Sequence, residues 1–147
     1  MATPESWGNT FARFCLLSGN HGSVFQHWGS KNQNTVAISA TEAEFMALAK
    51  TTQECIYMRG ILKSLMLEQE EPTVIFEDNQ GAIKLSKNPI INQRTKHIDV
   101  RYYFVREKIG KEIEIKYKET AEMVADCLTK PLGRVKVAKF AKYMLGA

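Results

Sequence analysis

The sequence predicts a mixed α/β (α+β) domain in which helices cover a sheet. Three observations predict this class. Two apolar segments near the N-terminus are separated by turn residues, a long helical pattern follows them, and two further strand patterns then occur singly between helical segments. Strands that return singly between helices are typical of a sheet with helices packed against its faces.

The N-terminal part of the chain predicts a hairpin and then a long helix. Residues 11–17 (FARFCLL) are rich in apolar and aromatic types, and residues 24–28 follow after a Ser-Gly-Asn turn signal, so we expect two antiparallel strands. Across residues 41–65 the apolar side chains mostly recur at steps of three and four, which indicates an amphipathic helix. Ser39 or Thr41 is its expected N-cap.

A strand is expected to lead directly into a second helix in the middle of the chain. Pro72 precedes the apolar run TVIFED at residues 73–78, which suits a buried strand. A helix is then expected from Asn79 to a point before Pro89, because the residue before a proline is disfavoured in helical conformation.

The C-terminal third predicts helices around one more strand. Residues 94–109 have apolar side chains at helical spacing, and residues 113–117 alternate apolar and charged side chains as a half-buried strand does. A further helix is expected to open at Thr120 and to be interrupted at Pro131, and a basic helix is expected to end the chain within residues 134–147.

Length and composition are those of one ordinary globular domain. The chain has 147 residues, of which 44% are hydrophobic and 24% charged, so composition excludes disordered, collagen-like and membrane classes. Its net charge of +4 permits contact with nucleic acid, although basic residues more often form a solvated face. Three scattered cysteines fit no disulfide framework, and no signal-like segment is present. We expect an intracellular protein, cytoplasmic or nuclear, that is not secreted and has no membrane partner.

Four short segments place an acidic residue beside small or polar neighbours at the ends of expected elements. Taken singly, Glu42, Asp78 and Asp126 are explained as carboxylates that complement a helix dipole. Taken in order, TEAEF, FEDNQGAIKL, RTKHIDVRYYFVREKI and VADCLTKPL resemble the successive motifs of the ribonuclease H domain of copia-type retrotransposon Pol polyproteins (Pseudoviridae). The resemblance runs from about Phe11 to Leu132 and assigns the whole chain, residues 1–147, to one domain.

The resemblance implies a ribonuclease H-like fold, with a five-stranded mixed sheet flanked by helices. It also implies carboxylates that bind two Mg²⁺ ions, or Mn²⁺, for hydrolysis of the RNA strand of an RNA–DNA hybrid during reverse transcription. The polyprotein would originally link this domain to a reverse transcriptase.

The resemblance also assigns catalytic, metal-binding roles to individual carboxylates. Glu44 matches the helix glutamate, and Glu42 is the alternative, because the two point about 200° apart around a helix and only one can face the sheet. Asp78 ends the strand and matches the Asp-Asn-Gln step, whereas Glu77 is expected to point to the opposite face. Asp126, on an expected helix, matches the last metal ligand.

Residues of suitable type near these carboxylates are candidates for binding the nucleic acid. Asn79 and Gln80 can bond sugar and phosphate groups, while Arg94, Lys96 and His97 would place positive charge beside the backbone. A structural role for His97 is an equal alternative. These contacts would recognise a hybrid by groove shape and 2′-hydroxyls.

The N-terminus departs from the family pattern. Aligning Trp7 with the family's tryptophan puts Pro4 where the first metal-binding aspartate belongs, and Glu5 is one residue out of register. Residues 1–10 are therefore expected to form a degenerate, truncated first strand, with weak or absent hydrolysis. Two alternatives follow: a catalytically inactive domesticated or decayed domain that binds nucleic acid or protein, and a fragment of a longer polyprotein with no function alone.

Overall fold

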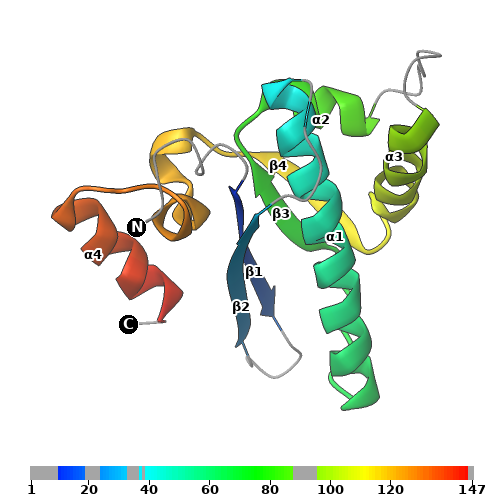
Figure 1. Cartoon of the computed structure of the whole chain (residues 1–147). Coiled ribbons are helices and arrows are strands. Elements are labelled where there is room, and N and C mark those ends of the chain that lie inside the picture. Colours follow the sequence, from blue (N-terminus) through cyan, green and yellow to red (C-terminus); the bar gives the residue numbers. More distant parts are fainter. Residues whose placement is uncertain (1–9, 19–23, 33–36, 38, 88–95, 146–147) are drawn as a thin grey trace.

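The computed structural model describes residues 10–18, 24–32, 37, 39–87 and 96–145 (Figure 1). In this part of the chain, the strands and helices as far as β4 follow one another in the order that the sequence predicts. The elements are β1 (Thr10–Ser18), β2 (Val24–Asn32), α1 (Ala40–Ser64), β3 (Thr73–Glu77), α2 (Gln80–Lys87), α3 (Lys96–Lys108), β4 (Ile113–Tyr117), the 3₁₀ turns η3 (Thr120–Glu122) and η4 (Val124–Leu128), and α4 (Arg134–Met144).

β1 and β2 form the predicted antiparallel hairpin. Their register runs from Thr10 opposite Asn32 to Ser18 opposite Val24. β1 also lies beside β3, so the hairpin stands next to the second pair of strands (Figure 1).

β3 and β4 pair in parallel, with Thr73 opposite Ile113 and Glu77 opposite Tyr117. Parallel neighbours need a crossover connection, and α2 and α3 provide it. Alternate β3 side chains, at Thr73, Ile75 and Glu77, are buried, which is the period of two expected of a strand with one face against the core. Both strands therefore end at the same edge of this sheet.

α1 is the central packing element of the domain. Ser39 is its N-cap: the side-chain oxygen accepts a hydrogen bond of 3.1 Å from the Glu42 N–H, which confirms one of the two predicted caps. The buried α1 side chains pack against the β3–β4 sheet and α3. The cluster comprises Phe45, Leu48, Ala49, Cys55, Leu62, Ile75, Ala82, Val105, Ile113 and Ile115.

Two contacts fix the neighbours of α1. The Phe45 and Tyr102 rings stack with centroids 4.0 Å apart, which joins α1 to α3. α2 approaches so closely that a Cβ on Gly81 would lie 2.9 Å from Thr41 Cγ2 and 2.9 Å from Asn79 Oδ1. Only glycine fits there without displacement, so the starts of α1 and α2 are held against each other.

The segment after β4 is less regular than predicted. A single helix was expected from Thr120, but two 3₁₀ turns form, separated by Met123 in extended conformation (φ −74°, ψ 104°). Neither turn begins with a side-chain cap, and the extended backbone at Met123 interrupts the helical conformation between them. The predicted terminal helix is confirmed as α4.

The mixed α/β class is confirmed, with α1, α2 and α3 on one side of the strands and η4 and α4 on the other (Figure 1). Hydrogen bonds join the four described strands in two pairs. The predicted first strand falls in residues 1–10, of which residues 1–9 lie outside the described part of the chain, and Thr10 begins β1. Among the residues that are described, none of the helices has the length and apolar character needed to cross a membrane.

Candidate functional site

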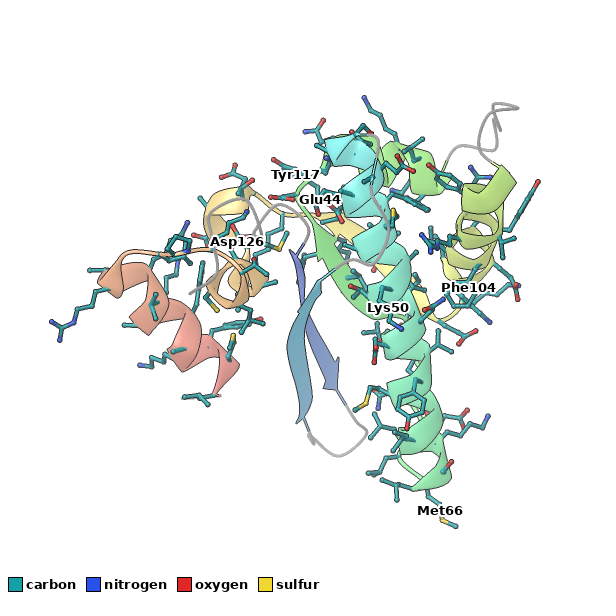
Figure 2. The ribbon with its side chains drawn as sticks, viewed as in Figure 1. Glu44, Lys50, Met66, Phe104, Tyr117 and Asp126 are labelled. Carbon is teal, nitrogen blue, oxygen red and sulfur yellow. The ribbon has the colours of Figure 1, made fainter. Side chains whose placement is uncertain are left out.

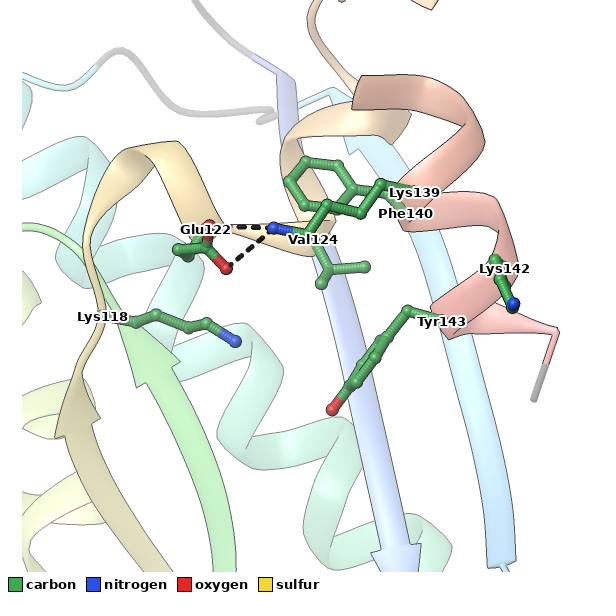
Figure 3. Close-up of a pocket in the computed structure, with 7 residues that line it drawn as sticks. All are labelled: Lys118, Glu122, Val124, Lys139, Phe140, Lys142 and Tyr143. Carbon is green, nitrogen blue, oxygen red and sulfur yellow. Dashed lines mark hydrogen bonds and ion pairs between the residues drawn. The ribbon is translucent and has the colours of Figure 1, made fainter. Parts of the chain in front are cut away.

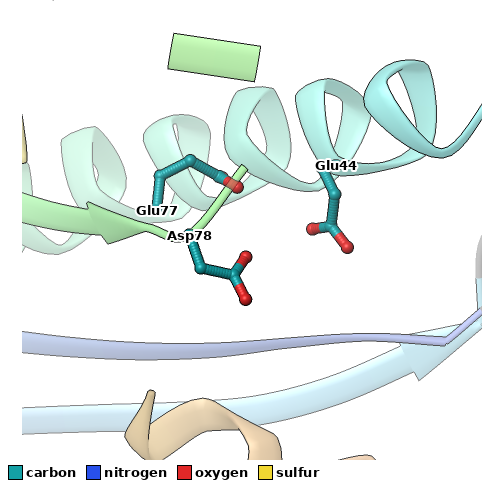
Figure 4. A group of neighbouring side chains, drawn as sticks. All are labelled: Glu44, Glu77 and Asp78. Carbon is teal, nitrogen blue, oxygen red and sulfur yellow. The ribbon is translucent and has the colours of Figure 1, made fainter. Parts of the chain in front are cut away.

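Three carboxylates converge where β3 ends. Glu77 is the last residue of β3, Asp78 follows it, and Glu44 comes from the beginning of α1. One oxygen from each carboxylate lies within 4.8 Å of those of the other two. Figure 4 shows the three side chains directed toward one another. The sequence-based choice of Glu44 and Asp78 thus corresponds to two side chains that the fold brings together.

Glu77 is a member of this cluster that sequence reasoning missed. We expected it to point away from Asp78 because successive strand residues alternate faces. That expectation was wrong, since β3 ends at Glu77 and the alternation does not extend to Asp78. Glu77 lies on the same face as the buried Ile75, and this hydrophobic face was the signal that could have revealed it.

The Glu77 carboxyl group is held in its protonated form near neutral pH. Burial raises its pKa from 4.5 to about 8, and the nearby charges of Glu44 and Asp78 add to the rise. The backbone N–H of Asn79 donates a hydrogen bond of 3.0 Å to Glu77 Oε1 and opposes the shift. Loss of water from the charged form therefore outweighs that single hydrogen bond.

The Glu44 carboxyl group also has a raised pKa, although much of its side chain is exposed. Desolvation of the carboxyl group is the largest cause, followed by repulsion from Asp78, while Lys130 acts in the opposite direction. Asp126 also raises the Glu44 pKa. The cluster is thus an excess of negative charge that a cation would relieve.

The remaining predicted carboxylate, Asp126, lies at the same end of the domain as Glu44 (Figure 2). It is on η4, not on the α-helix that was predicted, and it is largely buried. Its Oδ1 is 2.9 Å from Lys130 Nζ. Asp126 acts on Glu44 electrostatically, but it is outside the group of three oxygens that lie within 4.8 Å.

The segment after β4 also contacts the cluster. Thr120 donates a side-chain hydrogen bond of 2.7 Å to Asp78 Oδ2. The Lys118 N–H donates to the Glu77 carbonyl oxygen at 3.1 Å. These bonds attach the segment that leads to Asp126 to the end of β3.

The residues that were predicted to contact nucleic acid lie in different parts of the chain. Asn79 accepts a hydrogen bond of 3.1 Å from the Ala82 N–H through Oδ1 and so caps α2. Gln80, the first residue of α2, is exposed. Arg94 lies outside the described residues. Lys96 and His97 begin α3, and their side chains are also outside the described part.

The chemistry of the cluster fits a hard divalent cation. Its donors are the oxygens of three carboxyl groups, and Mg²⁺ prefers oxygen ligands. Oxygens on opposite sides of Mg²⁺ stand about 4.2 Å apart, twice the usual bond length. The cluster's limit of 4.8 Å is slightly wider, so small side-chain rotations would bring two oxygens into one coordination shell.

Comparison with curated proteins finds polyproteins of transposons. The chain is 46% identical over 110 residues, 74% of its length, to the Retrovirus-related Pol polyprotein from transposon TNT 1-94 of Nicotiana tabacum. It is 37% identical over 116 and 115 residues, 78% of its length in each case, to those from transposons RE2 and RE1 of Arabidopsis thaliana. The chain is homologous to part of retrovirus-related Pol polyproteins.

The homology concerns a small part of these relatives. The chain spans 8% of the length of each polyprotein that it matches. No family model and no solved structure matches the chain. The homologues therefore confirm the retroelement origin that the sequence motifs indicated, and the role of this segment has to be argued from its own residues.

Proposed function

We propose that this chain is the ribonuclease H-like domain of a copia-type retrotransposon polyprotein, with impaired hydrolysis of the RNA strand of RNA–DNA hybrids. The observation that carries the proposal is the convergence of Glu44 and Asp78, which are far apart in the sequence, within a cluster of oxygens spanning 4.8 Å. Homology to retrovirus-related Pol polyproteins supports a retroelement enzyme. The five-stranded mixed sheet of that family belongs to the same proposal.

The chain's own residues would position the reaction. Glu44, Asp78 and Asp126 would hold the Mg²⁺ or Mn²⁺ ions, which supply a metal-activated water and stabilise the departing oxygen. Thr120 orients the Asp78 carboxylate through its 2.7 Å hydrogen bond. Lys130 balances part of the charge on Asp126 and Glu44.

Impairment follows from Pro4, which stands where the family pattern has its first aspartate. A two-metal site that lacks one carboxylate loses electrostatic stabilisation worth several kcal/mol of barrier. The same substitution favours the alternative function, a catalytically inactive domain that binds nucleic acid. Glu77, protonated near neutral pH, does not replace the missing charge.

The test is cleavage of a labelled RNA–DNA hybrid in Mg²⁺ and in Mn²⁺ by the unaltered chain, Asp78→Asn and Pro4→Asp. Glu68→Gln is the matched control, because Glu68 is an exposed carboxylate paired with Lys63 beyond the far end of α1. Weak cleavage that Asp78→Asn abolishes and Glu68→Gln retains supports the nuclease.

Absence of cleavage by the unaltered chain, with activity gained in Pro4→Asp, supports the inactive domain. Absence of both cleavage and hybrid binding in all the variants refutes both functions. Circular dichroism of each variant excludes unfolding as the cause.

A further inference from the structure

A pocket of about 280 Å³ lies between the segment after β4 and the terminal helix α4 (Figure 3). Lys118 and Glu122 line it on one side, and Lys139, Phe140, Lys142 and Tyr143 of α4 line it on the other. The smallest pockets that bind small molecules have volumes of about 300 Å³. This pocket is near that lower limit, so it can hold a group no larger than a single nucleotide.

The pocket carries a positive charge. Its lining has three ammonium groups against the single carboxylate of Glu122. Lys139 Nζ is 3.0 Å from Glu122 Oε1 and 3.3 Å from Oε2, and this pair places the Lys139 ammonium at the pocket wall. Lys139, and more weakly Lys118 and Lys136, lower the Glu122 pKa. Glu122 thus stays ionised and neutralises only one of the three lysines.

An aromatic ring stands beside these charges. The Lys118 ammonium lies 5.9 Å from the Tyr143 ring centroid and 4.6 Å from that of Phe76. Tyr143 is 49% exposed, and Figure 3 shows it beside the pocket next to Lys118. Lysines next to a partly exposed ring are what proteins use to bind single-stranded nucleic acid, in which phosphates meet cations and a base stacks on the ring.

The pocket adjoins the carboxylate cluster through one short segment. The Lys118 N–H bonds the Glu77 carbonyl oxygen, and Thr120 bonds Asp78. Lys118 and Thr120 are two residues apart, and two residues of extended chain span at most about 7 Å. A nucleic acid strand with one phosphate at the carboxylates could therefore place a nearby nucleotide in the pocket.

We infer that this pocket binds one unpaired nucleotide of a nucleic acid strand that extends from the carboxylate site. Lys118 and Lys142 contact its phosphates, and its base stacks on Tyr143. The inference rests on the proposed function, because it extends the path of the same substrate. Stacking makes the pocket indifferent to base identity.

The test measures binding of a fluorescein-labelled single-stranded oligonucleotide by anisotropy, in EDTA so that no metal contributes. We expect Tyr143→Ala to weaken binding roughly fivefold or more, and Tyr143→Phe to retain it. Lys118→Ala and Lys142→Ala should each weaken binding and reduce the log–log salt slope by about 0.7.

Lys111→Ala is the matched control. Lys111 is exposed and precedes β4, at the end of the parallel sheet opposite the carboxylates. Equal losses in Lys111→Ala and Lys118→Ala would show binding by overall charge and overturn the inference. Unchanged binding by Tyr143→Ala would also overturn it.

Photocrosslinking of the unaltered chain to an oligonucleotide with 5-iodouracil avoids any folding defect in a variant. We expect the cross-link on the peptide that contains Tyr143, and a cross-link confined to other peptides contradicts the pocket. Different results would refute the nuclease proposal and the pocket proposal. Intact pocket binding without hybrid cleavage tells against the nuclease, whereas cleavage with no effect of Tyr143→Ala on binding tells against the pocket.

Discussion

Replacing Glu77 with glutamine should remove a pH dependence of stability that the carboxylate cluster creates. The Glu77 pKa is about 8 in the folded chain and near 4.5 in the unfolded chain. Between these values the folded state binds more protons than the unfolded state, so the free energy of unfolding falls as pH rises. Below about pH 4.5 both states are protonated, and above about pH 8 both are ionised, so the slope ends at both limits.

The size of the effect follows from the same two pKa values. Each pH unit between 4.5 and about 8 corresponds to about 1.36 kcal/mol. Glu77 ionisation therefore costs up to about 5 kcal/mol above pH 8. Relaxation around a buried charge reduces such a cost, so we expect the free energy of unfolding to fall by about 2–4 kcal/mol between pH 5 and pH 8.5.

Urea denaturation followed by circular dichroism at pH 5, 6.5 and 8.5 measures the effect in the unaltered chain and in Glu77→Gln. Glutamine is neutral, and its oxygen can still accept the Asn79 N–H. We expect nearly equal stability at pH 5 and a more stable variant at pH 8.5. Glu68→Gln controls for general charge removal at an exposed site. A pH slope as steep in Glu77→Gln as in the unaltered chain refutes the reasoning.

Three further outcomes test the core, a loop anchor and the cation site. Phe45→Ala should lower the free energy of unfolding, measured by urea titration, by about 3–5 kcal/mol because Phe45 is fully buried. Tyr57→Ala, at an exposed position of α1, should lower it by less than about 0.5 kcal/mol. Arg59→Ala should lower the free energy of unfolding by about 2–3 kcal/mol in the same titration. The reason is that the Arg59 guanidinium donates three hydrogen bonds of 2.6–2.9 Å to the segment before β3 and to Thr73. A loss below about 0.5 kcal/mol contradicts this prediction. Mg²⁺ should raise Tm by calorimetry, and more at pH 8.5 than at pH 6.5, because a cation at Glu44 and Asp78 binds more tightly when the neighbouring Glu77 is ionised. An equal rise in Asp78→Asn excludes the cluster as the site.

Local patterns predicted the elements well because their signals are local. The hydroxyl cap at Ser39, the apolar steps of α1 and the alternation at residues 113–117 each depend on neighbours in the sequence, and the structure confirms them. The prediction of a helix from Thr120 was wrong because Met123 takes an extended conformation and divides the segment into two 3₁₀ turns. The joining of strands into sheets depends on contacts between distant segments, which no local pattern contains.

The site was predictable only where a resemblance supplied long-range information. Periodicity alone could not have paired Glu44 with Asp78, because their proximity depends on α1 crossing the end of β3. Glu77 was missed because the alternation rule was extended one residue past the end of the strand. Asn79 Oδ1 accepts the Ala82 N–H and caps α2, which is a common role for a polar residue at a helix start. Its contact with nucleic acid stays a prediction.

The balance between a proton and a cation connects the cluster's stability to its chemistry. With Glu77 protonated, Glu44 and Asp78 face each other with Lys130 as a partial counter-charge. A divalent cation bound at Glu44 and Asp78 would lie beside a neutral Glu77 near neutral pH and beside an ionised Glu77 above about pH 8, so its binding should strengthen as pH rises. The same Glu77 proton therefore stabilises the fold without a metal and would weaken the binding of a metal.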